Sequence, residues 1–449
     1  MTRRLRRSLV AGLTVAALAF NALAPAMAAE RTALLRDAEA ETLIGDFARP
    51  ILKAAGLGAA SIQVRIVDDP MFNAFVADSR HIYINSGALL DCKTPNEIIG
   101  VIAHETGHLA ANHLSQLRKE ISRMQILSAI AMIGGAAAGI ASGNGRAGVA
   151  AAMGGMQIGQ RSLLSYAREQ ETSADMAGLK FLDKTGQSAN GMLETFKRLA
   201  DQQLFSAGGS DPYIQTHPMP ADRIAQIDEA ARKSKYFGKA DSPDLQARYD
   251  LVRAKFLGFT ASPQQINRQY PTTDTSLPAR YARAIMTYRY ADPASATARV
   301  DDLIESAPNN PYFWELKGQI LLETGSPAKA VEPLKKAVSL APNAGLIRVL
   351  YGQALIGTGS DRLVPEAIAA LTKGIGDDPD QPIGYRQLAI AYAKTGDTAM
   401  ADLATAQGSF AVGDIKAAKQ YALRAQGKLK VGSPGWLRAD DIITYKVRN

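Results

Sequence analysis

The sequence predicts a mainly α-helical protein with a small β-sheet, in which an N-terminal domain is followed by an α-solenoid. Three observations in the 449 residues support this class. Short alternating segments between residues 61 and 84 predict strands. A capped apolar segment that starts at Thr94 predicts a long buried helix. In the last third, prolines and glycines recur about every 34 residues, which is typical of stacked helical pairs.

The N-terminus has the features of a secretory signal peptide. Four arginines among the first seven residues precede an apolar run from Leu9 to Ala24, which is short for a membrane span. Ala26-Met27-Ala28 has the small residues of a cleavage site. We therefore expect cleavage after Ala28 and export to the periplasm; an uncleaved anchor is the alternative.

The charge balance gives no case for nucleic-acid binding. The formal net charge is +8, and removing residues 1–28 takes away four arginines and leaves +4. Cys92 is the only cysteine, which excludes an internal disulfide. It does not follow the signal directly, so we expect a soluble exported protein without a lipid anchor.

The domain predicted for residues 29–235 begins with a helix and a small sheet. Residues 30–57 have an amphipathic helical pattern, and Ser61 to Val67 alternates as a strand does. Two further extended segments are expected at 72–76 and 81–84, with a short helix before Thr94.

The helix that follows carries a complete start signal. Thr94 can cap the first turn, Pro95 suits the first helical position, and Glu97 stands where a capping box requires it. Apolar residues then recur at helical spacing, so most of this helix should be buried.

The motif HETGH lies on this helix. His104 and His108 are one turn apart on one face, so both imidazoles can bind one metal ion, and Glu105 lies beside them to take a proton. The alternative is a chance occurrence of the motif on an ordinary core helix. The capped apolar context and a ligand candidate further along the chain favour one zinc ion in a zincin-type metalloprotease domain.

The third ligand is expected on a helix at 165–184. Glu171 and Asp175 are four residues apart and share a face, whereas Glu169 lies roughly 200° around the helix from Glu171. We therefore predict Glu171 as the ligand. Asp175 can accept a hydrogen bond from a ligating imidazole or supply a proton. A solvated helix face is the alternative for this pair.

Residues 126–159 are nearly uncharged and rich in alanine and glycine. Each of their two arms is short for a membrane span. Three interpretations compete: a helical hairpin packed inside the protein, a segment that dips into a membrane surface, and a mobile cover near the active site.

Peptide hydrolysis at zinc also needs a base and a donor for the negative charge that develops on the substrate. Glu105 is the predicted base. His217 and Arg223, in the segment THPMPADRI, are the candidate donors. His217 can instead occupy the free zinc position and hold the enzyme inactive, because the glycine-containing stretch 207–211 precedes it. An ordinary loop histidine is the third possibility.

Two other histidines are expected to be structural. His81 falls in a predicted strand. His113 is five residues after His108, so on a continuous helix it would point elsewhere.

The last third should be a tetratricopeptide-repeat solenoid at 277–430. Pro308 and Pro342 are 34 residues apart, and Ala330 and Ala367 hold equivalent positions in the second helices. Such a stack leaves a concave surface suited to peptides or partner proteins. Before it we expect a polar linker at 236–276, and after it a tail at 431–449.

The segments HETGH, ETSAD and HPMPADR together resemble the HtpX and BepA-like gluzincin zinc peptidases over about residues 40–235. The segment NAFVADSRHIYINSGALL is similar to the family's edge strand, where an extended substrate is expected to pair. With tetratricopeptide repeats behind a signal sequence, the layout is similar to that of periplasmic beta-barrel assembly-enhancing proteases. The resemblance implies zinc on His104, His108 and Glu171, with Glu105 catalytic and Asp175 in support.

The predicted function is therefore an exported zinc endopeptidase in quality control or assembly of outer-membrane proteins. Its repeats would recruit unfolded or misassembled substrates, or an outer-membrane assembly complex. A chaperone or adaptor in which proteolysis is secondary is the alternative. Peripheral membrane contact through residues 126–159 also stays open.

Overall fold

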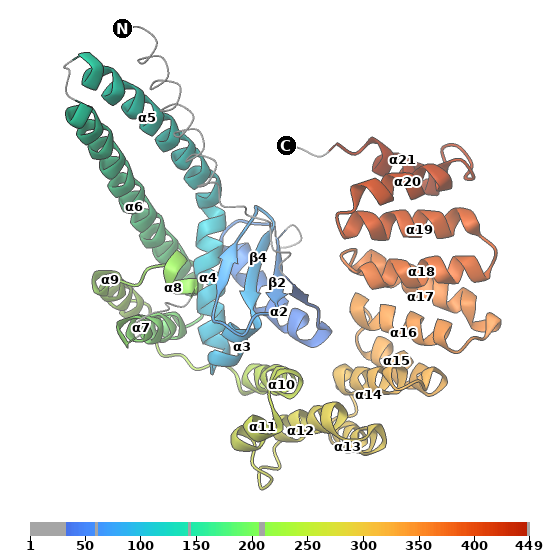
Figure 1. Ribbon diagram of the computed structural model, residues 1–449. Helices are drawn as coiled ribbons and strands as arrows, with labels where there is room; N and C mark the ends of the chain where they lie inside the picture. The colour runs from blue at the N-terminus through green and yellow to red at the C-terminus, as the bar shows by residue number, and fades with distance from the viewer. Residues whose placement is uncertain (1–32, 59–61, 142–144, 206–211, 447–449) are drawn as a thin grey trace. The chain divides into compact units, whose positions relative to one another are not determined.

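The computed structural model describes residues 33–58, 62–141, 145–205 and 212–446 (Figure 1). The expected signal peptide and the glycine-containing stretch 207–211 lie outside these ranges. Within them the fold is mainly helical with a small sheet, as predicted. Among the helices of these ranges, none combines the length and apolar content that crossing a bilayer requires.

The elements of the first half are β1 (Leu34–Leu35), α2 (Ala38–Ala54), β2 (Gln63–Val67), β3 (Ala74–Val76), β4 (His81–Asn85), α3 (Ser86–Asp91), α4 (Pro95–Ala110), α5 (His113–Ala141), α6 (Gly145–Lys184), α7 (Asn190–Phe205), α8 (Pro212–Thr216) and α9 (Ala221–Arg232). Those of the second half are α10 (Pro243–Thr260), α11 (Pro263–Gln269), α12 (Leu277–Tyr290), α13 (Pro293–Ser306), α14 (Pro311–Glu323), α15 (Pro327–Leu340), α16 (Gly345–Gly357), η1 (Asp361–Leu363), α17 (Val364–Asp377), α18 (Pro382–Lys394), α19 (Thr398–Ala411), α20 (Ile415–Gln426) and α21 (Pro434–Thr444).

The sheet holds its longer strands in the order β2-β4-β3. β2 and β4 are parallel, whereas β3 is antiparallel to β4 and pairs Val76 with Ile82. Ala74 and Ile82 are fully buried, so this face of the sheet contributes to the core. β3 is the last strand in the order, and its outer edge has no strand partner among the described residues.

Helix α4 begins as its sequence predicts. The Thr94 side chain accepts a hydrogen bond from the Glu97 amide, and Pro95 occupies the first turn. The Glu97 carboxylate accepts from the backbone amide of Lys93 rather than that of Thr94, and it also pairs with Arg198 at 2.8 Å. In a capping box Glu97 would accept from Thr94, but here it accepts from Lys93, the residue before Thr94. Its ion pair with Arg198 also links the start of α4 to α7.

Helices α4 and α6 approach each other closely because glycines face the contact. A Cβ atom on Gly107 would lie 2.6 Å from the carbonyl oxygen of Ala174, and one on Gly178 would lie 3.1 Å from the carbonyl carbon of Ala103. Any side chain at Gly107 would push the helices apart. The glycine inside HETGH thus sets the distance between the histidines of α4 and the acids of α6.

Helices α5 and α6 form a helical hairpin and run side by side (Figure 1). On α5, Ile126 and Ile130 are 62% and 60% exposed. The interpretation of this segment as a hairpin packed inside the protein is therefore wrong for the part of α5 whose side chains are described. The turn of the hairpin, residues 142–144, lies outside the described ranges.

The solenoid is a series of antiparallel helix pairs, beginning with α12 and α13. Ala330 on α15 and Ala367 on α17 are fully buried at equivalent positions, as the repeat predicts. In the expected tail, α21 packs against α20 through Ala439 and Ile442. The repeat stack therefore includes residues that the sequence pattern left out.

The expected linker at 236–276 is helical instead. Tyr249 and Phe256 of α10 are buried in the core that α4 belongs to, and the Tyr249 hydroxyl donates to the carbonyl oxygen of Leu89. On another face of α10, Ala254 packs against Ala282 of α12. A fragment that ends at residue 235 would lack this helix and expose the core beneath it.

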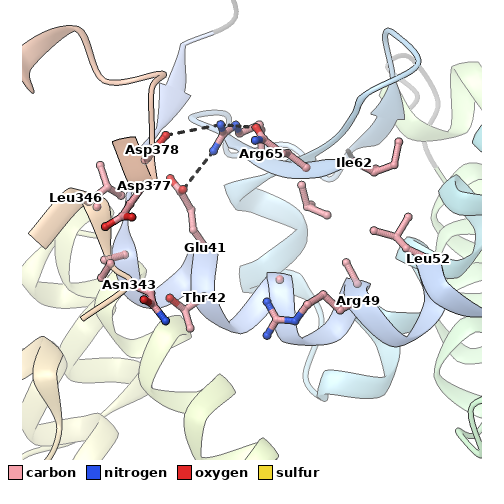
Figure 2. A pocket seen from close by; sticks show the side chains of 17 residues that line it. Glu41, Thr42, Arg49, Leu52, Ile62, Arg65, Asn343, Leu346, Asp377 and Asp378 are labelled. Atoms are coloured by element: carbon pink, nitrogen blue, oxygen red, sulfur yellow. Dashed lines mark hydrogen bonds and ion pairs between the residues drawn. The ribbon is translucent and has the colours of Figure 1, made fainter. Parts of the chain in front are cut away.

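A second contact joins the first half of the chain to the repeats. Arg65 on β2 pairs with Glu41 on α2 (Figure 2). It also lies 2.6 Å from Asp380 in the loop after α17. Beside these ion pairs is a cavity of about 340 Å³. Its walls come from α2, β2, residues 343–346 and the end of α17.

Candidate metal centre

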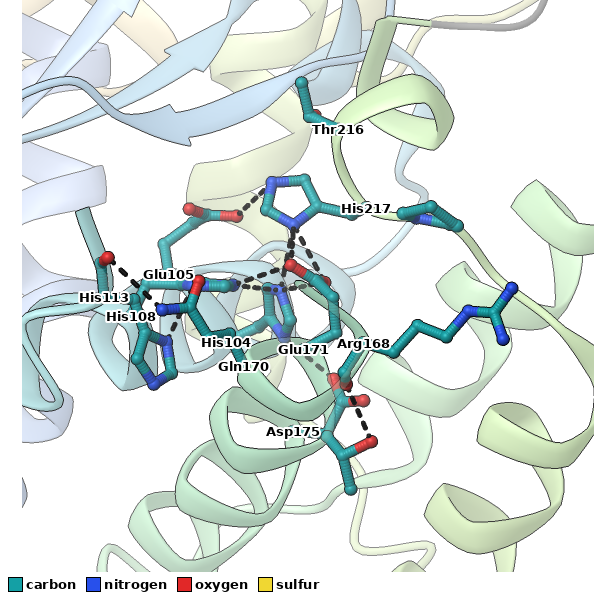
Figure 3. Close-up of polar contacts among 12 residues, drawn as sticks. His104, Glu105, His108, His113, Arg168, Gln170, Glu171, Asp175, Thr216 and His217 are labelled. Carbon is teal, nitrogen blue, oxygen red and sulfur yellow. Dashed lines mark hydrogen bonds and ion pairs between the residues drawn. The ribbon is translucent and has the colours of Figure 1, made fainter. Parts of the chain in front are cut away.

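Four side chains bring metal-binding atoms together. One ligand atom from each of His104, His108, Glu171 and His217 lies within 4.8 Å of the other three (Figure 3). His104 Nε2 is 3.1 Å from His108 Nε2, and His217 Nδ1 is 3.0 Å from Glu171 Oε2. All four are buried or nearly so. Three imidazoles and one carboxylate are a donor set that suits zinc.

The acids of α6 are arranged as the helical spacing indicates. Glu171 carries the cluster's only carboxylate, and Asp175 lies one turn further along the same face. Glu169 is exposed. Although burial raises the pKa of Glu171, His217 and His104 bring it well below the usual range, so the carboxylate is charged and available to a cation.

Asp175 holds the first histidine. Its Oδ1 is 2.8 Å from His104 Nδ1, and both side chains are fully buried. Burial lowers the pKa of His104, but Asp175 and Glu171 beside it raise that pKa to about 9. Once Nε2 has given up its proton, the proton that remains on Nδ1 faces Asp175 and the Nε2 lone pair is directed at the cluster, the usual arrangement for a ligating imidazole.

Arg223 is not free to act as an oxyanion donor. Its Nε lies 2.6 Å and its Nη2 2.8 Å from the two oxygens of Asp175. Its Nη1 donates to the carbonyl oxygen of Pro218 and lies 3.0 Å from Glu171. Each nitrogen of the guanidinium thus has a partner, and we infer that Arg223 fixes the two acids of α6 rather than donating to an oxyanion.

The surroundings of Glu105 suit a general base. The side chain is 1% exposed, and neither carboxylate oxygen has a hydrogen-bond partner within the described residues. The nearest cationic candidate is His217 Nε2 at 3.7 Å. Burial raises the pKa of Glu105, and His217 and His104 offset only part of that rise. A buried carboxylate without partners is costly unless it has a ligand or substrate to serve.

His217 is held by the aromatic core. It follows α8 directly, and its ring centroid is 4.5 Å from that of Tyr213 on the same helix. Tyr213 in turn packs against Phe72 and Phe196. Sequence reasoning did not find Tyr213, because a tyrosine in a short polar segment carries no signal of its own.

His113 was expected to point elsewhere, but the structure places it beside the site. Its Nδ1 is 3.0 Å from His108 Nδ1. The reason is the backbone at Asn112, which has a φ of 54° and ends the α4 path before α5 begins. Because the helix is interrupted there, counting residues per turn across it fails. His113 thus contacts His108 at Nδ1, the ring nitrogen that is not in the cluster, and holds the ring in place.

Replacing His113 with alanine should therefore weaken zinc binding by about 10–100-fold, the usual cost of losing a partner of a metal-binding histidine. Chelator competition on the purified protein measures this. His81→Ala is the matched control, because His81 contacts Asp78 on the β3–β4 turn. Equal zinc affinities of the two variants would contradict the supporting role of His113.

Comparison with known families gives an independent result for this half of the chain. Residues 35–231 match the model of Peptidase family M48. A Vibrio cholerae protein assigned as a beta-barrel assembly-enhancing protease is 28% identical over 253 residues, which is 55% of this chain and 51% of that protein. The beta-barrel assembly-enhancing protease of Yersinia pestis is 24% identical over 57% of this chain and 52% of its own.

A shorter stretch of the chain is similar to a mitochondrial protein. Mitochondrial metalloendopeptidase OMA1 of Schizosaccharomyces pombe is 26% identical over 40% of this chain and 49% of its own. The chain thus spans about half the length of the curated relatives it matches. Among solved structures, the crystal structure of MamA covers 36% of this chain and 90% of its own, with 22% identity and a TM-score of 0.29.

Proposed function

Residues 35–231 match the model of Peptidase family M48, and from this premise we propose that the protein is an exported zinc endopeptidase of the periplasm. The proposal is carried by one observation: beside the four-donor cluster lies Glu105, whose carboxylate accepts no hydrogen bond from the described residues. A structural zinc site would have no need of a buried carboxylate without a hydrogen bond.

Each side chain then has a defined part in hydrolysis. Zinc, when bound by His104, His108 and Glu171, lowers the pKa of water and polarises the scissile carbonyl. Glu105 takes the proton of the attacking water and passes it to the leaving amine. Asp175 keeps the His104 ring in the orientation that ligation needs, and Arg223 fixes Asp175.

We propose that His217 is inhibitory in the resting state. Its Nδ1 lies in the same cluster as the three predicted ligands, so it can fill the zinc position that water needs. The tilted contact with Tyr213 supports this placement. Movement of the α8 segment would withdraw the imidazole and admit water.

Replacing His217 with alanine should therefore raise basal cleavage. If the closed state holds about 90% of the molecules, the turnover rate should rise about 10-fold. The opposite role, donation to the developing oxyanion, would lower the rate by about 10²–10³-fold. Turnover of a flexible peptide at equal zinc content separates the two: a large fall would overturn the inhibitory role.

The proposed substrates are unfolded or misassembled outer-membrane proteins. Support comes from relatives that are named beta-barrel assembly-enhancing proteases and from the repeats, whose stacked pairs suit peptide or partner binding. The repeats would recruit the substrate or an outer-membrane assembly complex. The alternative function, a chaperone or adaptor with secondary proteolysis, rests on the same repeats.

The test uses the mature zinc-loaded protein and a urea-unfolded outer-membrane barrel, with reduced casein as a generic substrate. We expect cleavage of both, loss of cleavage after zinc removal by a chelator, and recovery when zinc returns. A protein with one zinc per chain that cleaves neither, yet delays barrel aggregation, would favour the chaperone alternative.

A further inference from the structure

We propose that a cavity beside His108 is a substrate subsite for an aliphatic side chain on the amino side of the scissile bond. This inference rests on the proposed peptidase function and adds a substrate preference to it. The cavity has a volume of about 390 Å³, within the range of roughly 300–1,000 Å³ that is typical of ligand pockets. The residues that line it are Leu57, Ile62, Val76, Asp78, Ser79, His108, Leu109, Asn112, Leu114, Ser115 and Arg118.

The cavity borders the candidate metal centre at His108. His108 contributes its Nε2 to the four-donor cluster, and its ring also lines the cavity. His104, one turn earlier on α4, does not line it. The cavity therefore lies toward the C-terminal end of α4, next to the point where a peptide bond would be cleaved.

The apolar part of the wall is made of five aliphatic side chains. Val76, Leu109 and Leu114 lie on β3, α4 and α5, whereas Leu57 and Ile62 lie in the connection between α2 and β2. Val76 shares a face of β3 with the buried Ala74, because side chains alternate along a strand. Phe75 between them stacks on Tyr83 on the opposite face. Three of the five aliphatic residues are therefore held by a strand and two helices.

The outer edge of β3, which has no strand partner in the part of the chain that the structure describes, gives the direction of the substrate. An extended peptide can add to this edge through main-chain hydrogen bonds, and antiparallel pairing is the more stable arrangement. Such a peptide has its amino end near Val76 and its carboxyl end near Ala74. Phe72, just before β3, packs on Tyr213, which contacts His217 of the cluster, so the metal centre lies toward the Ala74 end of β3. The cavity includes Val76 but not Ala74, so it receives a side chain that precedes the scissile bond.

The charged groups at the cavity do not compete for that side chain. The Asp78 carboxylate accepts hydrogen bonds from the backbone amides of Arg80 and His81, and it lies 2.8 Å from His81 Nδ1. Arg118 is exposed, one turn beyond Leu114 on α5. Burial of an aliphatic side chain against the remaining wall is favourable, whereas a carboxylate there would be poorly solvated.

The experiment measures kcat/KM of the zinc-loaded mature protein on fluorogenic peptides. Leucine, alanine or glutamate is placed at each of the three positions before the scissile bond. We expect leucine to exceed alanine by at least 10-fold at one of these positions, as aliphatic pockets achieve. Leu114→Trp should reduce this ratio below about 3.

Two further variants guard against misfolding. Leu57→Trp narrows the cavity from another wall and should act as Leu114→Trp does. Leu437→Trp, at an exposed leucine of α21, should leave the preference unchanged. Zinc content is measured on each variant.

Failure of the inference and failure of the proposed function look different. Cleavage with no preference before the scissile bond, or with the preference after it, overturns the subsite and leaves the peptidase standing. A preference that survives both Leu114→Trp and Leu57→Trp also overturns the subsite. Absence of zinc-dependent cleavage in every peptide overturns both.

Discussion

Replacement of Glu105 with glutamine should lower kcat by about 10²–10⁴-fold while the zinc content stays at the wild-type level. Glutamine keeps the shape of the side chain and cannot take a proton. Glu105 does not belong to the four-donor cluster, so its loss leaves the ligands in place. Steady-state hydrolysis of casein or a flexible peptide, with elemental analysis of the same preparations, gives both quantities.

The matched control for this variant is Glu194→Gln, an exposed carboxylate on α7. It should change neither activity nor zinc content. Wild-type activity in the Glu105 variant would remove Glu105 from the mechanism. Loss of zinc in the same variant would mean that Glu105 contributes to binding, contrary to its proposed role.

Replacement of Glu171 with alanine should weaken zinc binding by more than about 100-fold, beyond the usual cost of losing a supporting residue. Glu171 lies 3.4 Å from His108 Nε2 and 3.5 Å from His104 Nε2, and it is the only carboxylate of the cluster. Its removal also leaves Arg223 without one of its anionic partners. Zinc content after dialysis against a weak chelator measures the effect.

Glu169→Ala is the control on the same helix. Glu169 is two residues earlier and exposed, so the Glu169→Ala variant should hold as much zinc as the wild type. The reverse pattern, in which Glu169→Ala loses zinc and Glu171→Ala keeps it, would show that the ligand choice is wrong. Comparable losses in both variants would indicate a general disturbance of α6 instead.

Local patterns predicted the elements that carry the site. Thr94 and Pro95 mark the start of α4, and the spacing of His104 and His108 places both on one helical face. The same geometry separates Glu171 from Glu169 on α6. These features depend only on residues within about one helical turn, where chain geometry fixes which side chains are neighbours. The repeat period has the same local origin, because each helix pair is one unit of the stack.

What the local pattern could not decide was which distant groups meet. Arg223 was a candidate donor until its position against Asp175 showed every part of the guanidinium engaged. His113 lies against His108 because the chain turns at Asn112, a single left-handed residue that helical counting does not anticipate.

Helix α10 gives the same result at the scale of domains. Its sequence has no clear apolar stripe, because Tyr249 and Ala254 are buried on different faces, one against the peptidase core and one against the repeats. A helix buried between two bodies loses the one-sided pattern by which sequence reveals a helix.

The sequence by itself therefore determined the helices, the metal-binding motif and the repeats. The tertiary structure alone decided the partners of Arg223 and His113 and the helical junction, because those depend on packing between residues far apart in the chain.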